Sequence, residues 1–480
     1  MLVRDLLAAL DLGSSVAEHD DLLERYFVET ETFNIVINDR ADIIAGDKGT
    51  GKSALYRILS QRYSDIPELA NVEVVSAFNI KGTPVFQTLE AGDLLEESDY
   101  VRLWKTYFVA LAGNWLLELL DEYEYSPQLR WIEEVLKKNG LRTPDDTPKG
   151  VFARIVQAIR RSINIKTATA SVKTVGFEVD ASVDFFEKSS NVEGVPLVEH
   201  ALSALTKVLD EQEISIWLAV DRLDEAFQGR PAVETPALRG LLRAYLDMQE
   251  YQALKLKIFV RRDLFGRIIQ GGFVNLTHIN ARKVEIIWDD ADLSNLLSKR
   301  VSENTNFLKM LDARPDDAET HFDALFPEKV DRGDRKPLTW NWILSRIGDS
   351  NVKPPRNLID LVNKARESQL RAENRTPRLH EEGEALITSE ALKLGLDALS
   401  QERVQDTLLA EAGEYSEIIL GFRGGKAEQN LSSLSAILGE HSQLKIDYLA
   451  SIGFLEKTGA TYKIPMLYRG GLQISQGKAF

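Results

Sequence analysis

Eight consecutive residues near the amino end of the chain have the spacing of a phosphate-binding loop. They run GDKGTGKS, Gly46 to Ser53, and match the pattern G-x-x-x-x-G-K-[ST]. Glycines let backbone N–H groups curl around phosphates, the lysine reaches the β- and γ-phosphates, and the serine hydroxyl ligates Mg²⁺. The motif predicts a nucleoside triphosphate site with Lys52 on phosphate and Ser53 on the metal. The expected binding residues are Gly46, Asp47, Lys48, Gly49, Thr50, Gly51, Lys52, Ser53 and Ala54.

A second acidic motif follows an apolar run much later in the chain. Ile214 to Val220 is almost wholly apolar and is followed by Asp221, Asp224 and Glu225. A buried strand that delivers an aspartate at its carboxyl end is the Walker B arrangement, and the P-loop upstream gives this common pattern its meaning. We expect Asp221 to hold Mg²⁺ through water or Ser53, and Asp224 or Glu225 to orient the attacking water.

Two arginines are candidates for contact with the γ-phosphate. Arg261 follows the apolar strand segment Ile258 to Val260, and a cation at that strand end can touch the phosphate. The alternative, a surface arginine paired with Asp263, is less expected for Arg261 than for Arg262. Arg356 lies in the first turn of a helix that opens with two prolines, where the helix dipole disfavours a cation. Its position there indicates an anionic partner.

The elements that must position these residues alternate between strands and helices. Ile43 to Ala45 ends a strand before the loop, and residues 54–59 continue as a helix. Further strands are expected at 72–80, 258–260 and 283–288, and helices at 1–33, 98–160, 196–211, 232–253, 293–301 and 338–347. The aromatic stripe of the 98–160 region is expected to be core. Alternation over 162–186 predicts a β-hairpin outside the main sheet, which is either an arm that contacts a partner, the interpretation we favour, or an edge ornament.

Composition shifts divide the chain into three expected parts. These are an α/β ATPase core with a parallel sheet over 1–301 (insertion about 98–190), a helical lid over 302–375, and a small domain over 386–480. The small domain ends in a helix, a glycine and a hairpin around 458–460, as a winged helix does. Residues 441–480 hold five basic and two acidic side chains, an excess of three (5 − 2). DNA contact there is possible, but the recognition helix has few basic or amide side chains, so protein docking is an equal alternative.

Composition excludes several classes of protein. The 480 residues contain no cysteine, which rules out disulfides and thiolate metal sites, and their net charge of −16 argues against a general nucleic-acid-coating protein. The amino end is a poor signal peptide, and no later segment offers about 18 uninterrupted apolar residues. We therefore expect a cytoplasmic protein without membrane contact.

In this order, the motifs resemble the AAA+/STAND branch of P-loop ATPases, and most closely origin-recognition-type ATPases with a helical lid and a C-terminal winged helix. GDKGTGKS corresponds to Walker A, and IWLAVDRLDE resembles the STAND form of Walker B, in which D-x-x-D-E replaces D-E. IFVRRD is similar to the end of the sensor 1 strand, with Arg261 as the candidate, and PPRNLIDLV to the sensor 2 helix, with Arg356. The resemblance implies ATP and Mg²⁺ as ligands and a nucleotide-driven switch that assembles a homo-oligomer or engages an effector protein. A setting in bacterial antiphage defence or mobile elements is implied weakly.

One departure from the family leaves the function open. Arg222, not glutamate, follows Asp221. Hydrolysis then depends on Asp224 or Glu225, or is slow. Three hypotheses follow: an assembly switch, a DNA-remodelling ATPase that uses the winged helix, and a scaffold with a nearly silent nucleotide site. Arg239 and Arg243 are candidates for an arginine that completes a neighbour's site, and both are equally well explained as surface residues. An ABC-type ATPase is disfavoured because no LSGGQ-like segment precedes Asp221.

Overall fold

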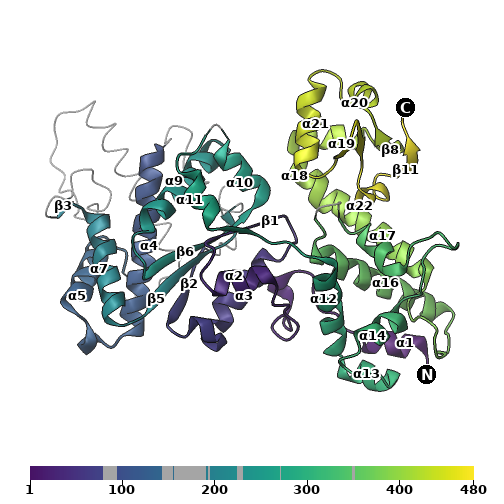
Figure 1. The fold of residues 1–480 in the computed structure, drawn as a ribbon, viewed down its shortest axis with the longest axis horizontal. Coiled ribbons are helices and arrows are strands. Elements are labelled where there is room, and N and C mark those ends of the chain that lie inside the picture. The colour runs from purple at the N-terminus through teal and green to yellow at the C-terminus, as the bar shows by residue number, and fades with distance from the viewer. Residues whose placement is uncertain are drawn as a thin grey trace. The chain divides into compact units, whose positions relative to one another are not determined.

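The computed structural model describes residues 1–78, 95–142, 155, 191–192, 195–223, 231–270, 272–348 and 352–480 (Figure 1). The chain forms two compact units. The core unit comprises Glu31–Gly46 and Lys52–Ile286, and the terminal unit comprises Met1–Thr30, Asp47–Gly51 and Ile287–Phe480. The predicted three-part division at 302 and 386 stays a prediction. No helix among the described residues combines the length and apolarity needed to cross a bilayer.

The core unit is built on a five-stranded, wholly parallel sheet in the order β2-β5-β6-β1-β7. The strands are β1 Ile43–Gly46, β2 Val72–Phe78, β5 Ser215–Val220, β6 Leu254–Arg261 and β7 Lys283–Glu285. β1 is buried along its whole length, as expected for a parallel strand covered on both faces. The predicted fold class, α/β with a parallel-sheet P-loop NTPase core, is confirmed. β7 is shorter than the predicted strand 283–288.

Helices pack around this sheet and supply most of the apolar core. They are α2 Glu31–Ile37, α3 Lys52–Arg62, α4 Glu97–Leu119, α5 Pro127–Lys138, α7 Leu197–Glu211, α9 Pro231–Met248, α10 Arg262–Ile269 and α11 Leu276–Ala281. The aromatic stripe of α4 is core, as predicted: Trp104 is buried, and its indole donates to the Ala237 carbonyl of α9 at 2.8 Å. Gly240 of α9 permits this approach, because a Cβ there would lie 2.6 Å from Tyr100 Cβ. The predicted hairpin at 162–186 lies outside the described residues.

The helical part of the terminal unit surrounds a long helix. Its members are α1 Val3–Ala9, α12 Asp290–Ser302, α13 Thr305–Leu311, α14 Ala318–Leu325, α15 Thr339–Leu344, α16 Pro355–Arg375 and α17 Ser389–Glu402. α16 and α17 pack closely because Gly395 of α17 has no side chain; a Cβ there would lie 2.7 Å from the Ala365 nitrogen. The predicted helix over 1–33 is wrong in extent. Only α1 and a 3₁₀ turn, Ala17–His19, form before α2 begins at Glu31.

The last 65 residues form a small α/β assembly with its own apolar cluster. Its elements are α19 Ser416–Leu420, β8 Lys426–Gln429, α20 Leu431–Leu438, α21 Ser442–Ser451, β9 Glu456–Thr458, β10 Thr461–Lys463, α22 Met466–Arg469 and β11 Ser475–Lys478. The predicted hairpin is β9–β10, which turns at Gly459. β10 also pairs with β8, giving the sheet order β11-β8-β10-β9. A π-helical segment, Arg403–Leu409, links α17 to this assembly.

Candidate nucleotide-binding site

Asp221 lies directly after β5 at the carboxyl edge of the parallel sheet, where ligands bind in open α/β folds. Its side chain is only 4% exposed. Burial raises the pKa of its carboxyl group to about 6, although a backbone N–H of Arg222, the charges of Lys52 and Arg222, and the hydroxyl of Ser53 all act to lower it. Burial therefore outweighs the positive charges and hydrogen-bond donors around this carboxylate.

Lys52 and Ser53 open helix α3 and meet Asp221 within the core unit. The Ser53 hydroxyl lies close enough to the Asp221 carboxylate to help lower the pKa of that carboxyl group, which places the two predicted metal ligands beside each other. The Lys52 ammonium donates to the Gly46 carbonyl at 2.9 Å. Each is where a Mg²⁺–nucleotide complex would require it, because Mg²⁺ is bound through one or two protein oxygens together with phosphates. The donor set fits the metal.

The loop between these residues adopts the backbone conformation that its glycines permit. Gly49 and Gly51 have φ of +80° and +98°, which side-chain-bearing residues rarely adopt. The loop is closed by the Thr50 hydroxyl, which donates to the Asp47 carbonyl at 2.8 Å. Lys48 is exposed, and Ala54 lies in the first turn of α3. A substitution with a Cβ at either glycine would strain the loop.

Two residues of the terminal unit contact this loop. The Trp288 indole donates to the Thr50 carbonyl at 2.8 Å, and its ring lies 3.8 Å from a Cβ built on Gly51. Arg356, in the first turn of α16, lies against Gly49: its backbone N–H donates to the Gly49 carbonyl at 3.4 Å, and its Cβ is 3.1 Å from a Cβ built there. The predicted candidate Arg356 is therefore at the P-loop. Trp288 was not predicted, because nothing in its sequence context marks it.

The guanidinium of Arg356 has one nitrogen without a partner. Its Nε atom is buried and has no hydrogen-bond partner within the described part of the chain. Burial, followed by the positive charge of Arg403, lowers the pKa of Arg356, although the charges of Asp360, Glu18 and Glu402 act to raise it. An anion beside Gly49 would give this guanidinium a direct partner.

The other predicted cations are engaged by acids of the core unit. Arg261 ends β6, pairs in register with Gly46, and binds Asp263 through Nε at 3.0 Å and Nη2 at 3.2 Å. Arg262 forms an ion pair with Glu285 at 2.9 Å. The pairing with Asp263, which was as much expected for Arg262 as a phosphate contact and less expected for Arg261, is made by Arg261. A γ-phosphate contact by Arg261 remains a prediction.

Arg239 and Arg243 of α9 also have internal partners. Both bind Glu97, and both lie over the ring of Phe273, at 5.3 and 5.2 Å from its centroid. Arg239 additionally donates to the carbonyls of Ile268 and Gly272, each at 3.0 Å. These internal contacts account for the positions of both arginine side chains without any contact from a neighbouring subunit. Their proposed action in a neighbour's site stays a prediction.

The acids that would orient water, Asp224 and Glu225, lie outside the described residues. Arg222, which lies where the AAA+ enzymes that the sequence resembles have glutamate, has a left-handed backbone with φ of +58°. The chain therefore turns sharply directly after Asp221.

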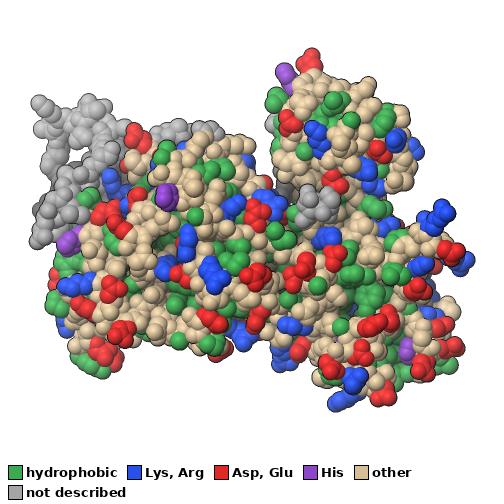
Figure 2. Space-filling model, viewed as in Figure 1, with side chains coloured by type: hydrophobic (Ala, Val, Ile, Leu, Met, Phe, Trp, Pro, Cys, Tyr) green, Lys and Arg blue, Asp and Glu red, His purple; other side chains and the backbone are tan. Residues whose placement is uncertain are grey.

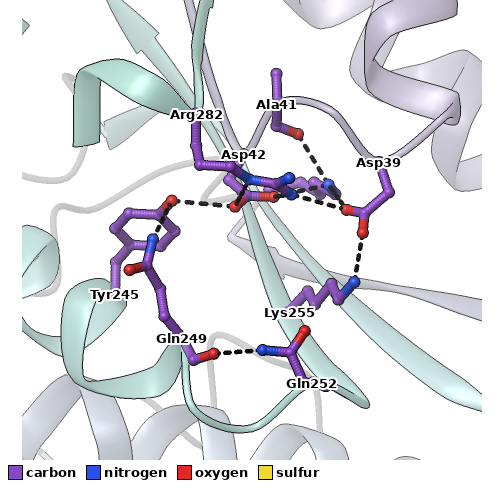
Figure 3. Close-up of polar contacts among 9 residues, drawn as sticks. Asp39, Ala41, Asp42, Tyr245, Gln249, Gln252, Lys255 and Arg282 are labelled. Carbon is purple, nitrogen blue, oxygen red and sulfur yellow. Dashed lines mark hydrogen bonds and ion pairs between the residues drawn. The ribbon is translucent and has the colours of Figure 1, made fainter. Parts of the chain in front are cut away.

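The amino edge of the same sheet, where β1 and β7 begin, carries an ion network that the sequence did not predict (Figure 3). Asp42, directly before β1, accepts from Lys257 at 2.8 Å, from Arg282 at 2.8 and 2.9 Å, and from Tyr245 at 3.0 Å. Asp39 binds Lys255, Lys257 and Arg282. A cavity of about 390 Å³ opens beside the network, lined partly by α9 and α11. It lies at the other end of β1 from the P-loop, because β1, Ile43–Gly46, separates Asp42 from the loop.

Comparisons with known proteins give distant likenesses. No family model matches the chain. A putative transposon gamma-delta 80.3 kDa protein of Escherichia coli K12 is 21% identical over 301 residues, covering 60% of this chain and 39% of that protein. The chain thus spans about two fifths of that relative's length. A Walker-type ATPase of Pyrococcus abyssi aligns over 97% of this chain and 100% of its own, with 12% identity and a TM-score of 0.39. The assignment of a P-loop NTPase fold rests on the parallel sheet and the P-loop of the chain itself.

Proposed function

We propose that the chain is an ATP-binding and hydrolysing switch of the AAA+/STAND kind. The observation that carries this proposal is the proximity of Ser53 to buried Asp221, which brings the Walker A and Walker B motifs together. The strand order supports it further, because β6 lies between the P-loop strand β1 and the Walker B strand β5. In the AAA+ fold this intervening strand carries sensor 1, and here it ends at Arg261.

Each residue has a role that its surroundings support. Mg²⁺, when bound, would neutralise the β- and γ-phosphates, and Ser53 and Asp221 would hold it. Lys52 would exchange the Gly46 carbonyl for phosphate oxygens, since an ammonium bonds more strongly to an anionic acceptor. Backbone N–H groups of residues 47–54 would bind the phosphates. Arg356, which lies against Gly49, would contact the γ-phosphate and report it to α16. Asp224 or Glu225 would orient water.

ATP turnover tests the enzyme. We expect Mg²⁺-dependent phosphate release by the full chain, lowered at least 100-fold by Lys52→Ala or Asp221→Asn. Lys207→Ala, which changes an exposed lysine of α7, is the matched control and should retain wild-type turnover. Glu225→Gln and Asp224→Asn identify the acid that orients water. Turnover in Lys52→Ala equal to that of the wild-type chain would refute hydrolysis at this site and leave a nucleotide-free or nucleotide-bound scaffold.

We further propose that the nucleotide state controls assembly with a second copy or with an effector protein. Support comes from Arg356, which connects the P-loop to α16 and has an unsatisfied guanidinium nitrogen. A setting in mobile elements is consistent with the name of the putative transposon protein to which the chain is similar. Particle mass measured with ATP, with ADP and without nucleotide tests this role. A single mass for the purified chain in all three conditions, with no nucleotide-dependent partner retained, would contradict it.

DNA binding through residues 441–480 is the second candidate. The order α19-β8-α20-α21-β9-β10 supports a winged helix in that region. Its exposed face argues for protein contact instead: Leu444 of α21 is 68% exposed, and Lys445 donates to the Leu438 carbonyl at 2.7 Å. Acidic and basic side chains are interspersed on the face drawn in Figure 2. Salt-dependent duplex binding that a Lys445/Lys463 charge reversal abolishes would favour the DNA candidate.

A further inference from the structure

Helix α16 contains the natural partner of Arg356, yet the two do not pair. Asp360 follows Arg356 by four residues, the spacing at which oppositely charged side chains meet on one helix face. Arg403 binds the Asp360 carboxylate instead, through Nη2. The same guanidinium donates from Nε to the Asn357 side-chain oxygen at 2.7 Å. Arg403 thus binds the two polar side chains that follow Arg356 on α16.

Arg403 is held firmly in this position. It is only 9% exposed, and its third nitrogen donates to Glu402 at 2.8 Å. Glu402 is in turn paired with Lys364 of α16 at 2.5 Å. α16 and α17 are clamped together where Gly395 meets Ala365. Arg403 also begins the π-helical segment that leads to the C-terminal assembly. Its position therefore depends on the packing of α16 against α17 and on this segment.

The consequence is that the nearest acid on α16 is not bonded to Arg356. Asp360 and Glu402 are bound by Arg403 and Lys364, and Glu18 acts on Arg356 through its charge. The buried Nε of Arg356 has no partner among the described residues. A phosphate beside Gly49 would supply a direct anionic partner, whereas an ion pair with Asp360 would remove the need for it.

We propose that Arg403 is a positioning residue that withholds Asp360 from Arg356 and so keeps the Arg356 guanidinium available to the γ-phosphate of ATP. The inference rests on the proposed function of Arg356. It also gives the C-terminal assembly a route to the nucleotide site: any movement of the segment that begins at Arg403 would release Asp360 and neutralise Arg356.

Nucleotide affinity of the full chain tests the inference. Arg403→Gln should weaken binding of a non-hydrolysable ATP analogue by about tenfold, the worth of one charge-assisted hydrogen bond, and leave ADP affinity nearly unchanged. The double variant Arg403→Gln/Asp360→Asn should recover ATP affinity, because the competing carboxylate is gone. Arg371→Gln, an exposed arginine of α16 paired at 3.9 Å with Glu367, is the matched control and should bind both nucleotides as wild type does. Loss of packing alone would lower affinity for both nucleotides and would not be rescued.

The outcomes separate this inference from the proposed function. Arg356→Gln should weaken ATP binding whether or not Asp360 is present; if it has no effect, the proposed role of Arg356 fails. If Arg356→Gln weakens ATP binding but Arg403→Gln does not, or if Asp360→Asn gives no rescue, only the role of Arg403 is overturned. Should Arg403→Gln fold poorly, Arg403→Met provides the same test, because it keeps the length of the side chain but cannot bind Asp360.

Discussion

Two buried aspartates lie at opposite ends of the strands of the same parallel sheet, and the pKa values of their carboxyl groups are shifted in opposite directions. Asp42 precedes β1, and Asp221 follows β5; they are 6% and 4% exposed. Burial acts to raise the pKa of both. At Asp42, Arg282 and Lys257 outweigh burial, so the pKa of its carboxyl group lies below the usual value. At Asp221 burial prevails, and the pKa rises to about 6.

The difference separates a structural charge from a functional one. Asp42 bonds three donors, Lys257, Arg282 and Tyr245, and so joins the starts of β1 and β7 to the middle of β6 and to α9. Asp221 has a hydroxyl, a backbone N–H and the more diffuse charges of Lys52 and Arg222. A buried carboxylate left in this state costs stability, which is reasonable only if a further cation joins it. Ion pairs therefore stabilise the sheet at its amino edge, whereas the carboxylate at its carboxyl edge is the one that we propose to bind Mg²⁺.

Asp42→Asn should give the largest effect, because it breaks a buried ion network. Lys257, 1% exposed, would keep only Asp39 and a backbone carbonyl as strong acceptors. Removing one member of a buried pair costs about 3–5 kcal/mol, so we expect a loss of that size in the unfolding free energy of the core unit. Denaturant unfolding without nucleotide measures it. Asp65→Asn, whose exposed side chain pairs with Arg62 at 3.7 Å, is the control and should change little. If Asp42→Asn left the unfolding free energy unchanged, packing and not charge would stabilise this edge.

The same substitution at the carboxyl edge, Asp221→Asn, should change the folding stability in the opposite direction. At pH 7 an aspartate whose pKa rises from 3.8 to about 6 on folding costs about 3 kcal/mol of stability. Asp221→Asn removes that cost. We therefore expect the nucleotide-free variant to be more stable than the wild-type chain by up to that amount, while losing Mg²⁺-dependent turnover. If Asp221→Asn destabilised the nucleotide-free chain as Asp42→Asn does, the contrast between the two edges would be lost.

The pH dependence of that gain provides a sharper measurement. A carboxyl group whose folded pKa is raised binds its proton more tightly in the folded state, so its penalty grows as pH rises from about 4 to about 6. The excess stability of Asp221→Asn should thus be full at pH 7–8, shrink below pH 6 and vanish near pH 4. The contribution of Asp42, whose pKa is lowered, has the opposite dependence: it is present at neutral pH and is lost only as pH falls below about 4. Melting curves of both variants against wild type over pH 4–8 test the two directions together.

The sequence placed the P-loop and Asp221 at the same edge of the sheet because each motif is local in sequence. Gly46 to Ser53 are consecutive, and Asp221 follows an apolar strand, so parallel strands bring both motifs to one edge. The partners of Asp42 come from segments more than 200 residues away in sequence. A signal was present in Lys255 and Lys257, whose spacing of two places both on one face of a strand that is otherwise apolar. Their acidic partners could not be named without the strand order.

The misjudged details have similar causes. Which of Arg261 and Arg262 binds Asp263 depends on side-chain direction where β6 ends and α10 begins, and the sequence does not give that direction. β8 and β11 were missed because their sequences, KAEQ and SQGK, are polar and lack the alternation of a half-buried strand. Their pairing is decided by neighbouring strands. Trp288 was missed because its indole acts on a loop that lies far away in sequence.

Tyr245→Phe should give the smallest effect, and it tests how redundant the amino edge is. The phenol donates to Asp42 at 3.0 Å and accepts from Gln249 at 2.8 Å. Because Asp42 keeps Lys257 and both bonds from Arg282, losing one neutral donor should cost only about 1 kcal/mol. Tyr251→Phe, which removes a longer 3.3 Å bond to Glu199, is the matched control. Unfolding of both variants at pH 7 provides the measurement. A loss in Tyr245→Phe as large as that of Asp42→Asn would mean that the phenol, and not the cations, keeps the Asp42 carboxylate ionised.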